Sequence, residues 1–173
     1  MNRMRYLIAL TTAVLASFPL SAMAGSWKDI NQLSVLVQAT GTEIVQSNCE
    51  GSNLGYYEYN HDKEIDRMTL CIDKLNMKDN NAVWETLAHE STHVAQSCLN
   101  DYVFEAKYSP RIFRTIRAEA PHYARILESY ASDDKLTEAE AFYMELRPPI
   151  EVKKMIIDAC GITSERIDSF KED

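Results

Sequence analysis

Two histidines four residues apart, His89 and His93 in the segment HESTH, place the strongest constraint on how this chain folds. Residues at this spacing lie one turn apart on the same face of an α-helix, so both imidazoles can reach a single metal ion. Glu90 lies about 100° further round such a helix, close enough to act on a water molecule at that ion. The segment therefore predicts a helix that carries a metal centre with a carboxylate beside it.

The residues around this segment have the pattern of an amphipathic helix running from about residue 80 to residue 99. At about 100° per residue, the polar residues that share one side are Glu85, His89, His93 and Gln96. The apolar residues on the opposite side are Trp84, Leu87, Ala88, Val94, Ala95, Cys98 and Leu99. Such a helix buries its apolar side and turns its polar stripe toward a cleft. The alternative, two surface histidines that stack by chance, is less consistent with this division.

A catalytic zinc ion normally has three protein ligands, so a third ligand is expected elsewhere in the chain. The segment LTEAEAFYMELR offers Glu138 and Glu140. Glu140 also has a structural explanation, because Thr137 and Glu140 have the spacing of a capping box at a helix start. An earlier start, capped by Asp133 or Asp134, would instead place Glu138 inside the helix.

With these two segments the chain resembles the gluzincin-type zinc metallopeptidases, in which HEXXH is followed on a later helix by a glutamate ligand. Several such families write the later helix as Glu-x-x-Ala, and aligning Ala141 with that alanine makes Glu138 the third ligand. The resemblance also implies that His89 and His93 are the histidine ligands of Zn2+ and that Glu90 is the catalytic general base.

The resemblance departs at one position. Many of these families carry Asp or Asn directly after the alanine, where it supports a ligand histidine from behind. This chain has Phe142 there. The choice between Glu138 and Glu140 therefore stays open, and the family pattern favours Glu138.

The resemblance implies a zinc-dependent hydrolase, most simply a metallopeptidase that cleaves the peptide bonds of a peptide or protein substrate with a zinc-activated water. The same residues would also serve a hydrolase of non-peptide amides. An alternative of another class is an exported, disulfide-stabilised binding or inhibitory protein with a vestigial zincin site. The sequence does not single out the group that stabilises the transition state; the candidates are Tyr102, Tyr123, Tyr130, Tyr143, Arg111 and His122.

The first 24 residues have the three parts of a secretory signal peptide. Arg3 and Arg5 precede an apolar stretch, residues 7–20, and Ala22-Met23-Ala24 forms an A-x-A cleavage site. We expect residues 1–24 to be removed and residues 25–173 to form a single metallopeptidase-like domain that is periplasmic or secreted.

The remaining chain is acidic. Removing the signal peptide takes away two of the 18 basic residues and none of the 26 acidic ones, which changes the net charge from −8 to 16 − 26 = −10. Such a chain, without a basic stripe, argues against nucleic acid as a partner. No later segment is apolar enough to span a membrane, so no membrane association is expected after cleavage. The sequence does not indicate an oligomeric state.

Four cysteines follow the signal peptide, and an even number in an exported protein implies two disulfides. Four cysteines allow three pairings. We favour Cys49–Cys71, which brackets a predicted hairpin, and Cys98–Cys160, with Cys98 facing the core on the apolar side of the histidine helix. A cysteine zinc site is disfavoured because the chain has no CxxC pair.

Helices are expected to predominate, with a small β-sheet just before the HEXXH helix. The expected helices lie at about residues 26–41, 80–99, 111–118, 121–130, around Glu138, 150–160 and after Thr163, and the expected strands at 42–46, 55–59 and 67–72. This order predicts an α+β fold, similar to the zincin-like fold. In such a fold the strand ending at Ile72 would border the cleft and could pair with an extended peptide.

Overall fold

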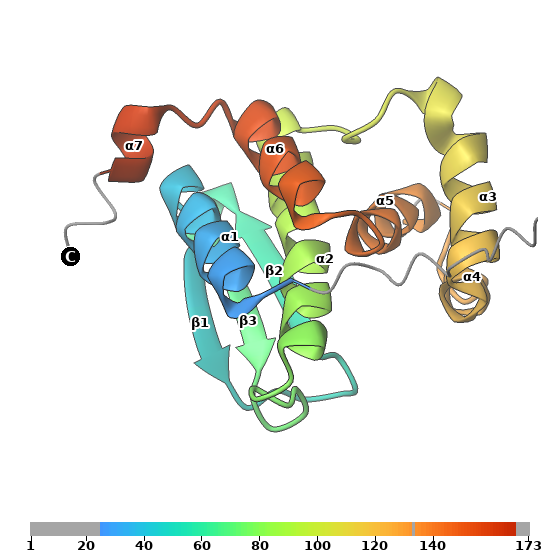
Figure 1. The fold of residues 1–173 in the computed structure, drawn as a ribbon, viewed down its shortest axis with the longest axis horizontal. Coiled ribbons are helices and arrows are strands. Elements are labelled where there is room, and N and C mark those ends of the chain that lie inside the picture. The colour runs from blue at the N-terminus through green and yellow to red at the C-terminus, as the bar shows by residue number, and fades with distance from the viewer. Residues whose placement is uncertain (1–24, 133, 169–173) are drawn as a thin grey trace, which may run out of the picture.

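The computed structural model describes residues 25–132 and 134–168 (Figure 1). The predicted signal peptide, residues 1–24, and the candidate cap Asp133 lie outside the described residues. The expected α+β fold is confirmed: helices predominate, and a small sheet precedes the helix that carries HESTH. No helix in the described part of the chain is long and apolar enough to cross a membrane.

The elements follow the sequence patterns closely. The strands are β1 (Glu43–Ser47), β2 (Gly55–Asn60) and β3 (Ile65–Cys71). The α-helices are α1 (Trp27–Thr40), α2 (Asn80–Leu99), α3 (Ser109–Glu119), α4 (Pro121–Leu127), α5 (Lys135–Glu145), α6 (Pro149–Cys160) and α7 (Ser164–Asp168). Short 3-10 turns are formed by His61–Lys63 and Ala106–Tyr108.

The sheet has the strand order β1-β3-β2, with β1 parallel and β2 antiparallel to β3. Because β3 is central, both of its edges are already paired: Thr69 lies opposite Val45 on one side and Tyr56 on the other. The expectation that the strand ending near Ile72 pairs with a substrate is therefore wrong. The edge strand next to α2 is β2.

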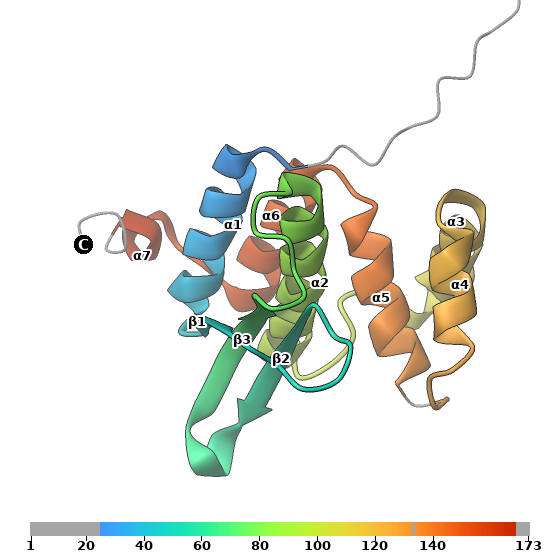
Figure 2. The same ribbon diagram turned by 90° about the horizontal axis from the view of Figure 1, so that it is seen from below.

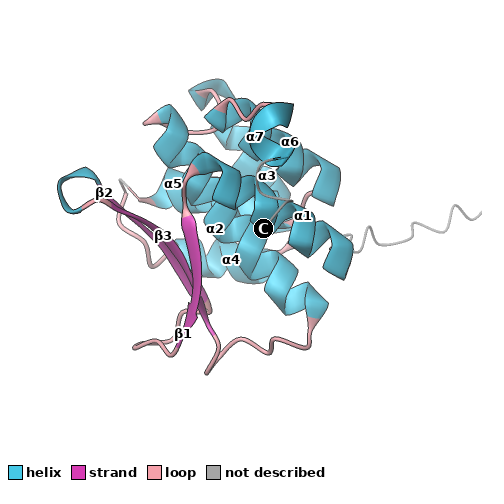
Figure 3. Cartoon of the chain, turned by 90° about the vertical axis from the view of Figure 1, so that its left-hand side faces the viewer, coloured by secondary structure: helices cyan, strands magenta, loops and turns pink. Residues whose placement is uncertain are grey.

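Helix α2 occupies the centre of the molecule. The helices gather on one side of the sheet, and α2 lies between α1, α5, α6 and β2 (Figures 1 and 3). Eleven of its 20 residues are buried, so its polar side is covered as well as its apolar side. Asp79 caps its first turn by accepting hydrogen bonds from the backbone amides of Asn81 and Ala82, and Asn100 ends it in the left-handed conformation.

Helices α3 and α4 form the end of the molecule furthest from the sheet and pack on α5 (Figure 2). A separate small apolar cluster holds them there, formed by Ile112, Ile116, Leu127, Ala139 and Phe142. The main core lies between α1, α2, α6 and the sheet and includes Leu33, Met68, Trp84, Leu87 and Ile156. Helix α5 therefore joins the two clusters, and it faces α2 along the polar side of that helix.

Both predicted disulfides are present. Cys49 pairs with Cys71 around the β2–β3 hairpin, and Cys98 pairs with Cys160. The expectation that Cys98 faces the core is wrong, because this residue is exposed. Cys98 lies in the last turn of α2 and Cys160 is the last residue of α6, so the bridge ties two helix ends at the edge of the core. The helical angle predicts the direction in which Cys98 points, but it does not predict whether a neighbouring element extends far enough to cover that position.

Candidate metal centre

Helices α2 and α5 bring together the three metal ligands expected from the sequence. The Nε2 atom of His89 lies 3.4 Å from Oε2 of Glu138, and Nε2 of His93 lies 3.7 Å from Oε1 of the same carboxylate. One ligand atom from each residue lies within 4.8 Å of the other two, a spacing that could hold a metal ion. Among the described residues this is the group of three that meets that condition.

Glu138 rather than Glu140 faces the histidines because α5 begins earlier than a Thr137 cap requires. The helix starts at Lys135, which places Glu138 in its first turn on the side of α2. Glu140, about 200° further round, is 1% exposed and points elsewhere. The capping-box explanation for Glu140 is therefore wrong, although that explanation and the structure agree that Glu140 is not a ligand.

The carboxylate of Glu140 has a structural role. It accepts hydrogen bonds from the backbone amides of Val103 and Phe104, at 2.8 and 2.9 Å, and from Nε2 of Gln96 at 3.0 Å. These bonds fasten the segment after α2 to α5. They also hold Gln96, whose other amide atom reaches the metal centre.

Each candidate ligand histidine has a hydrogen-bond partner at Nδ1, on the side of the ring away from Glu138. Nδ1 of His89 lies 2.5 Å from Oε1 of Glu145, and Nδ1 of His93 lies 2.8 Å from Oε1 of Gln96. Since both partners are oxygen acceptors, each Nδ1 carries the proton and donates it. The Nε2 atom of each ring is then directed toward Glu138, in position to bind a metal ion in place of a proton.

The sequence reasoning missed the role of Glu145, which replaces the Asp or Asn absent at Phe142. Phe142 instead packs its ring against His89, with ring centroids 4.9 Å apart. Glu145 lies seven residues after Glu138, two turns along the same face of α5, so helical spacing was a signal that could have found it. Gln96 was visible on the polar stripe of α2, but nothing in the sequence assigned it to a histidine.

Glu90 lies beside the ligands without a partner of its own. The residue is 6% exposed and lines the same cleft, and among the described residues it has no hydrogen-bond or ion-pair partner. Burial raises the pKa of Glu90 to about 7; the charge of His89 lowers this pKa and the charges of Glu138 and Glu145 add to the rise. A buried carboxylate with this pKa can accept and return a proton near neutral pH.

The charges around the candidate ligands favour a bound cation. Burial lowers the pKa of His93, and the neighbouring His89 lowers it further. For His89 burial acts in the same direction, but the adjoining carboxylates of Glu138 and Glu145 outweigh it and raise its pKa to about 10. Glu138 and Glu145 thus favour positive charge at the position of His89. A divalent cation would provide the same compensation, and Oε2 of Glu138, buried without a hydrogen bond, would gain a partner.

The centre opens into a cleft of about 420 Å³ between the β2 edge, α2, α4 and α5. Of the six candidates for stabilising a transition state, Tyr123 and Tyr130 line this cleft, and the other four do not. The pKa of Tyr123 is raised by burial and by Glu145, and that of Tyr130 is raised to about 12 by burial and by Glu138. Both hydroxyls therefore stay protonated near neutral pH and can donate hydrogen bonds.

Gly55 allows β2 to approach α2 at the level of the centre. A Cβ atom at this position would lie 2.8 Å from Cγ2 of Thr86, 3.0 Å from the backbone oxygen of Thr69 and 3.4 Å from Cγ of Glu90. The first of these distances is too short for any side chain without movement. The absence of a side chain at Gly55 therefore sets the width of the cleft on its β2 side.

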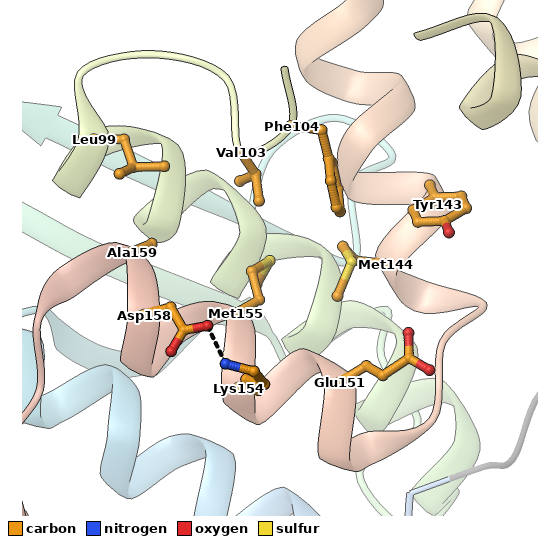
Figure 4. Close-up of a pocket in the computed structure, with 10 residues that line it drawn as sticks. All are labelled: Leu99, Val103, Phe104, Tyr143, Met144, Glu151, Lys154, Met155, Asp158 and Ala159. Carbon is orange, nitrogen blue, oxygen red and sulfur yellow. Dashed lines mark hydrogen bonds and ion pairs between the residues drawn. The ribbon is translucent and has the colours of Figure 1, made fainter. Parts of the chain in front are cut away.

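A second hollow, of about 410 Å³, lies between α5, α6 and the segment after α2 (Figure 4). Its walls are mainly apolar, and Lys154 and Asp158 form an ion pair at its rim. It contains no histidine, and no group of three metal-ligating residues among the described side chains lies there. Among the described residues, the candidate metal ligands therefore lie in the cleft that contains His89 and His93.

Comparison with known proteins identifies a family but no activity. A family model described as a domain of unknown function (DUF8637) matches residues 35–160, which is 126 of the 173 residues. The matched part contains all the candidate ligands together with Glu90, Gln96 and Glu145. No curated protein and no solved structure matches the chain.

Proposed function

We propose that this chain, which belongs to the DUF8637 family, is a zinc-dependent metallopeptidase. The observation that carries the proposal is the convergence of two imidazole Nε2 atoms and one carboxylate within 4.8 Å, next to a buried carboxylate that has no other partner. Two nitrogens and one oxygen from protein form a donor set typical of catalytic zinc. Zinc, when bound to His89, His93 and Glu138, would act as a Lewis acid toward the substrate carbonyl.

Glu90 is the general base in this proposal. Its carboxylate accepts the proton of the attacking water and returns it to the leaving amine, for which a pKa of about 7 is well suited. Glu145 and Gln96 keep the two imidazoles in the orientation that directs Nε2 into the cleft. Tyr123 and Tyr130 are the cleft hydroxyls that can donate to the oxyanion as it develops.

The position of β2 as an edge strand favours a peptide over a non-peptide amide as the substrate. In the described part of the chain no strand pairs with the outer side of β2, and residues 53–57, at and just before its start, line the cleft. An extended peptide can add to such an edge through main-chain hydrogen bonds, which would lay its backbone across the centre. The two disulfides are compatible with a protein exported to the periplasm or secreted, where such substrates would be met.

Replacing Glu90 by Gln tests this proposal. The amide keeps the volume of the side chain but cannot act as a base, so we expect the variant to fold, to bind zinc and to lose at least about a hundredfold in turnover of a peptide-library substrate. Glu151→Gln, an exposed carboxylate at the other hollow, is the matched control and should keep full turnover.

Unchanged turnover in Glu90→Gln would reject the role of Glu90. A wild-type protein that binds zinc but cleaves no peptide would favour a non-peptide amide substrate. A wild-type protein that binds no metal would favour the alternative function, an exported binding or inhibitory protein with a vestigial site.

A further inference from the structure

Among the described residues, those that line the cleft beside the candidate metal centre include acidic side chains and no lysine or arginine. Its four carboxylates are those of Glu85, Glu90, Glu138 and Glu145. If both histidines are neutral and all four carboxylates are ionised, a divalent cation compensates two of the four negative charges and leaves two uncompensated. The proposed function assigns a role to three of the four residues, and Glu85 has none.

Glu85 lies one turn before His89 on the same face of α2. Among the described residues it has no hydrogen-bond or ion-pair partner, and its side chain reaches solvent. The pKa of Glu85 is raised by burial of part of the side chain and by the charges of Glu145 and Asp79, and the charge of Glu85 in turn acts on Tyr123. Glu85, Glu145 and Tyr123 all line this cleft, and the charges of both carboxylates act on Tyr123.

A half-buried tyrosine, Tyr56, forms part of the wall of this cleft beside Tyr123, whose own ring stacks on Phe142 with centroids 4.5 Å apart. Aromatic faces accept the alkyl stem and the charged head of lysine and arginine side chains. Glu145 is bonded to His89, Glu138 faces both histidines and Glu90 is the proposed general base, which leaves Glu85 as the carboxylate available to a bound basic side chain. Aromatic walls combined with a free carboxylate are suited to a basic side chain and poorly suited to an acidic one.

We propose that Glu85 is a specificity-determining residue that receives a lysine or arginine side chain of a peptide lying in the cleft. This inference rests on the proposed function, since it concerns the substrate of the same site. It narrows the substrate class from peptides in general to peptides with a basic residue near the scissile bond.

The test compares the zinc-loaded wild-type protein with Glu85→Gln on paired peptides. Each pair has lysine or glutamine at a single position, from three residues before the cleaved bond to three residues after it. We expect the wild type to favour lysine at one of these positions by about fivefold or more in kcat/KM. Glu85→Gln should lose that preference while keeping its kcat/KM on the glutamine peptide. The preference of the wild type should also weaken as salt concentration rises.

Three outcomes would count against this inference or against its basis. Equal kcat/KM on lysine and glutamine peptides in the wild type, or a lysine preference that persists in Glu85→Gln, would overturn the role of Glu85 and leave the peptidase proposal intact. Failure of the zinc-loaded wild type to cleave any peptide would overturn both. Glu151→Gln serves as the control for loss of one negative charge elsewhere and should keep the lysine preference.

Discussion

Replacing Glu145 tests how strongly the zinc affinity of the proposed site depends on the hydrogen bond between Glu145 and Nδ1 of His89. Its Oε1 atom lies 2.5 Å from Nδ1 of His89, and the residue is only 6% exposed, so water cannot readily take over this bond. Loss of such an outer partner typically weakens metal binding by about 10–100-fold, or roughly 1.4–2.7 kcal/mol. We expect Glu145→Ala to reach the upper part of that range. Glu145→Gln should lose less, because its amide oxygen can still accept the Nδ1 proton.

The assay is the zinc dissociation constant at neutral pH, measured by competition with a chromophoric chelator on variants that circular dichroism shows to be folded. Glu85→Gln is the control, because it removes a negative charge from the same cleft without touching a ligand. An equal loss of affinity in Glu85→Gln and Glu145→Gln would mean that net charge, rather than the bond to His89, explains the effect. Glu145→Ala with wild-type affinity would refute the reasoning.

Three further predictions concern the scaffold. Gly55→Ala should lower the melting temperature in thermal unfolding, because its Cβ would lie too close to Cγ2 of Thr86. Adding Thr86→Ser removes that methyl group and should restore part of the lost melting temperature. Replacing both Cys98 and Cys160 by Ala should reduce the free energy of unfolding by about 4 kcal/mol on the chain-entropy account. The variant should still bind zinc under conditions where it is folded. Loss of zinc from folded protein would show that the disulfide shapes the site. The pKa of Asp29 is lowered from 3.8 to about 2 by its bonds to the Ser26 cap and a lysine, so this carboxylate stabilises the fold above about pH 4 and its contribution is lost as pH falls toward 2. Asp29→Asn should therefore cost about 1 kcal/mol in urea unfolding at neutral pH, and a difference that persisted at pH 2 would contradict the assignment.

Local sequence patterns were sufficient to predict much of this structure. The position of α2 follows from the periodicity around HESTH, and its end coincides with Asn100, a residue that adopts the left-handed conformation readily. The partners of the four cysteines were also correct, because one pair brackets a hairpin and the other joins two predicted helices. The candidate metal ligands were predicted together with this framework: helical spacing fixes the relative positions of His89 and His93, and the resemblance to the gluzincins indicated Glu138.

Features that depend on packing between distant segments were not predictable in the same way. The central place of β3 depends on which strand returns beside it, and no local pattern encodes that choice. Glu140 resembled a cap because of its spacing from Thr137. Its actual partners, the amides of Val103 and Phe104, lie more than 30 residues away in the sequence, so no local pattern indicates them. Glu145 was overlooked because its position behind His89 depends on how α5 crosses α2.

The metal content of the purified protein tests the central claim most directly. We predict one zinc ion per chain in the wild type and loss of that zinc in His89→Ala, His93→Ala and Glu138→Ala. The matched controls are His61→Ala and His122→Ala, two exposed histidines outside the cleft, and both should keep full zinc occupancy. A wild type without zinc, or full occupancy in both His89→Ala and His93→Ala, would contradict the assignment of this site as a zinc centre.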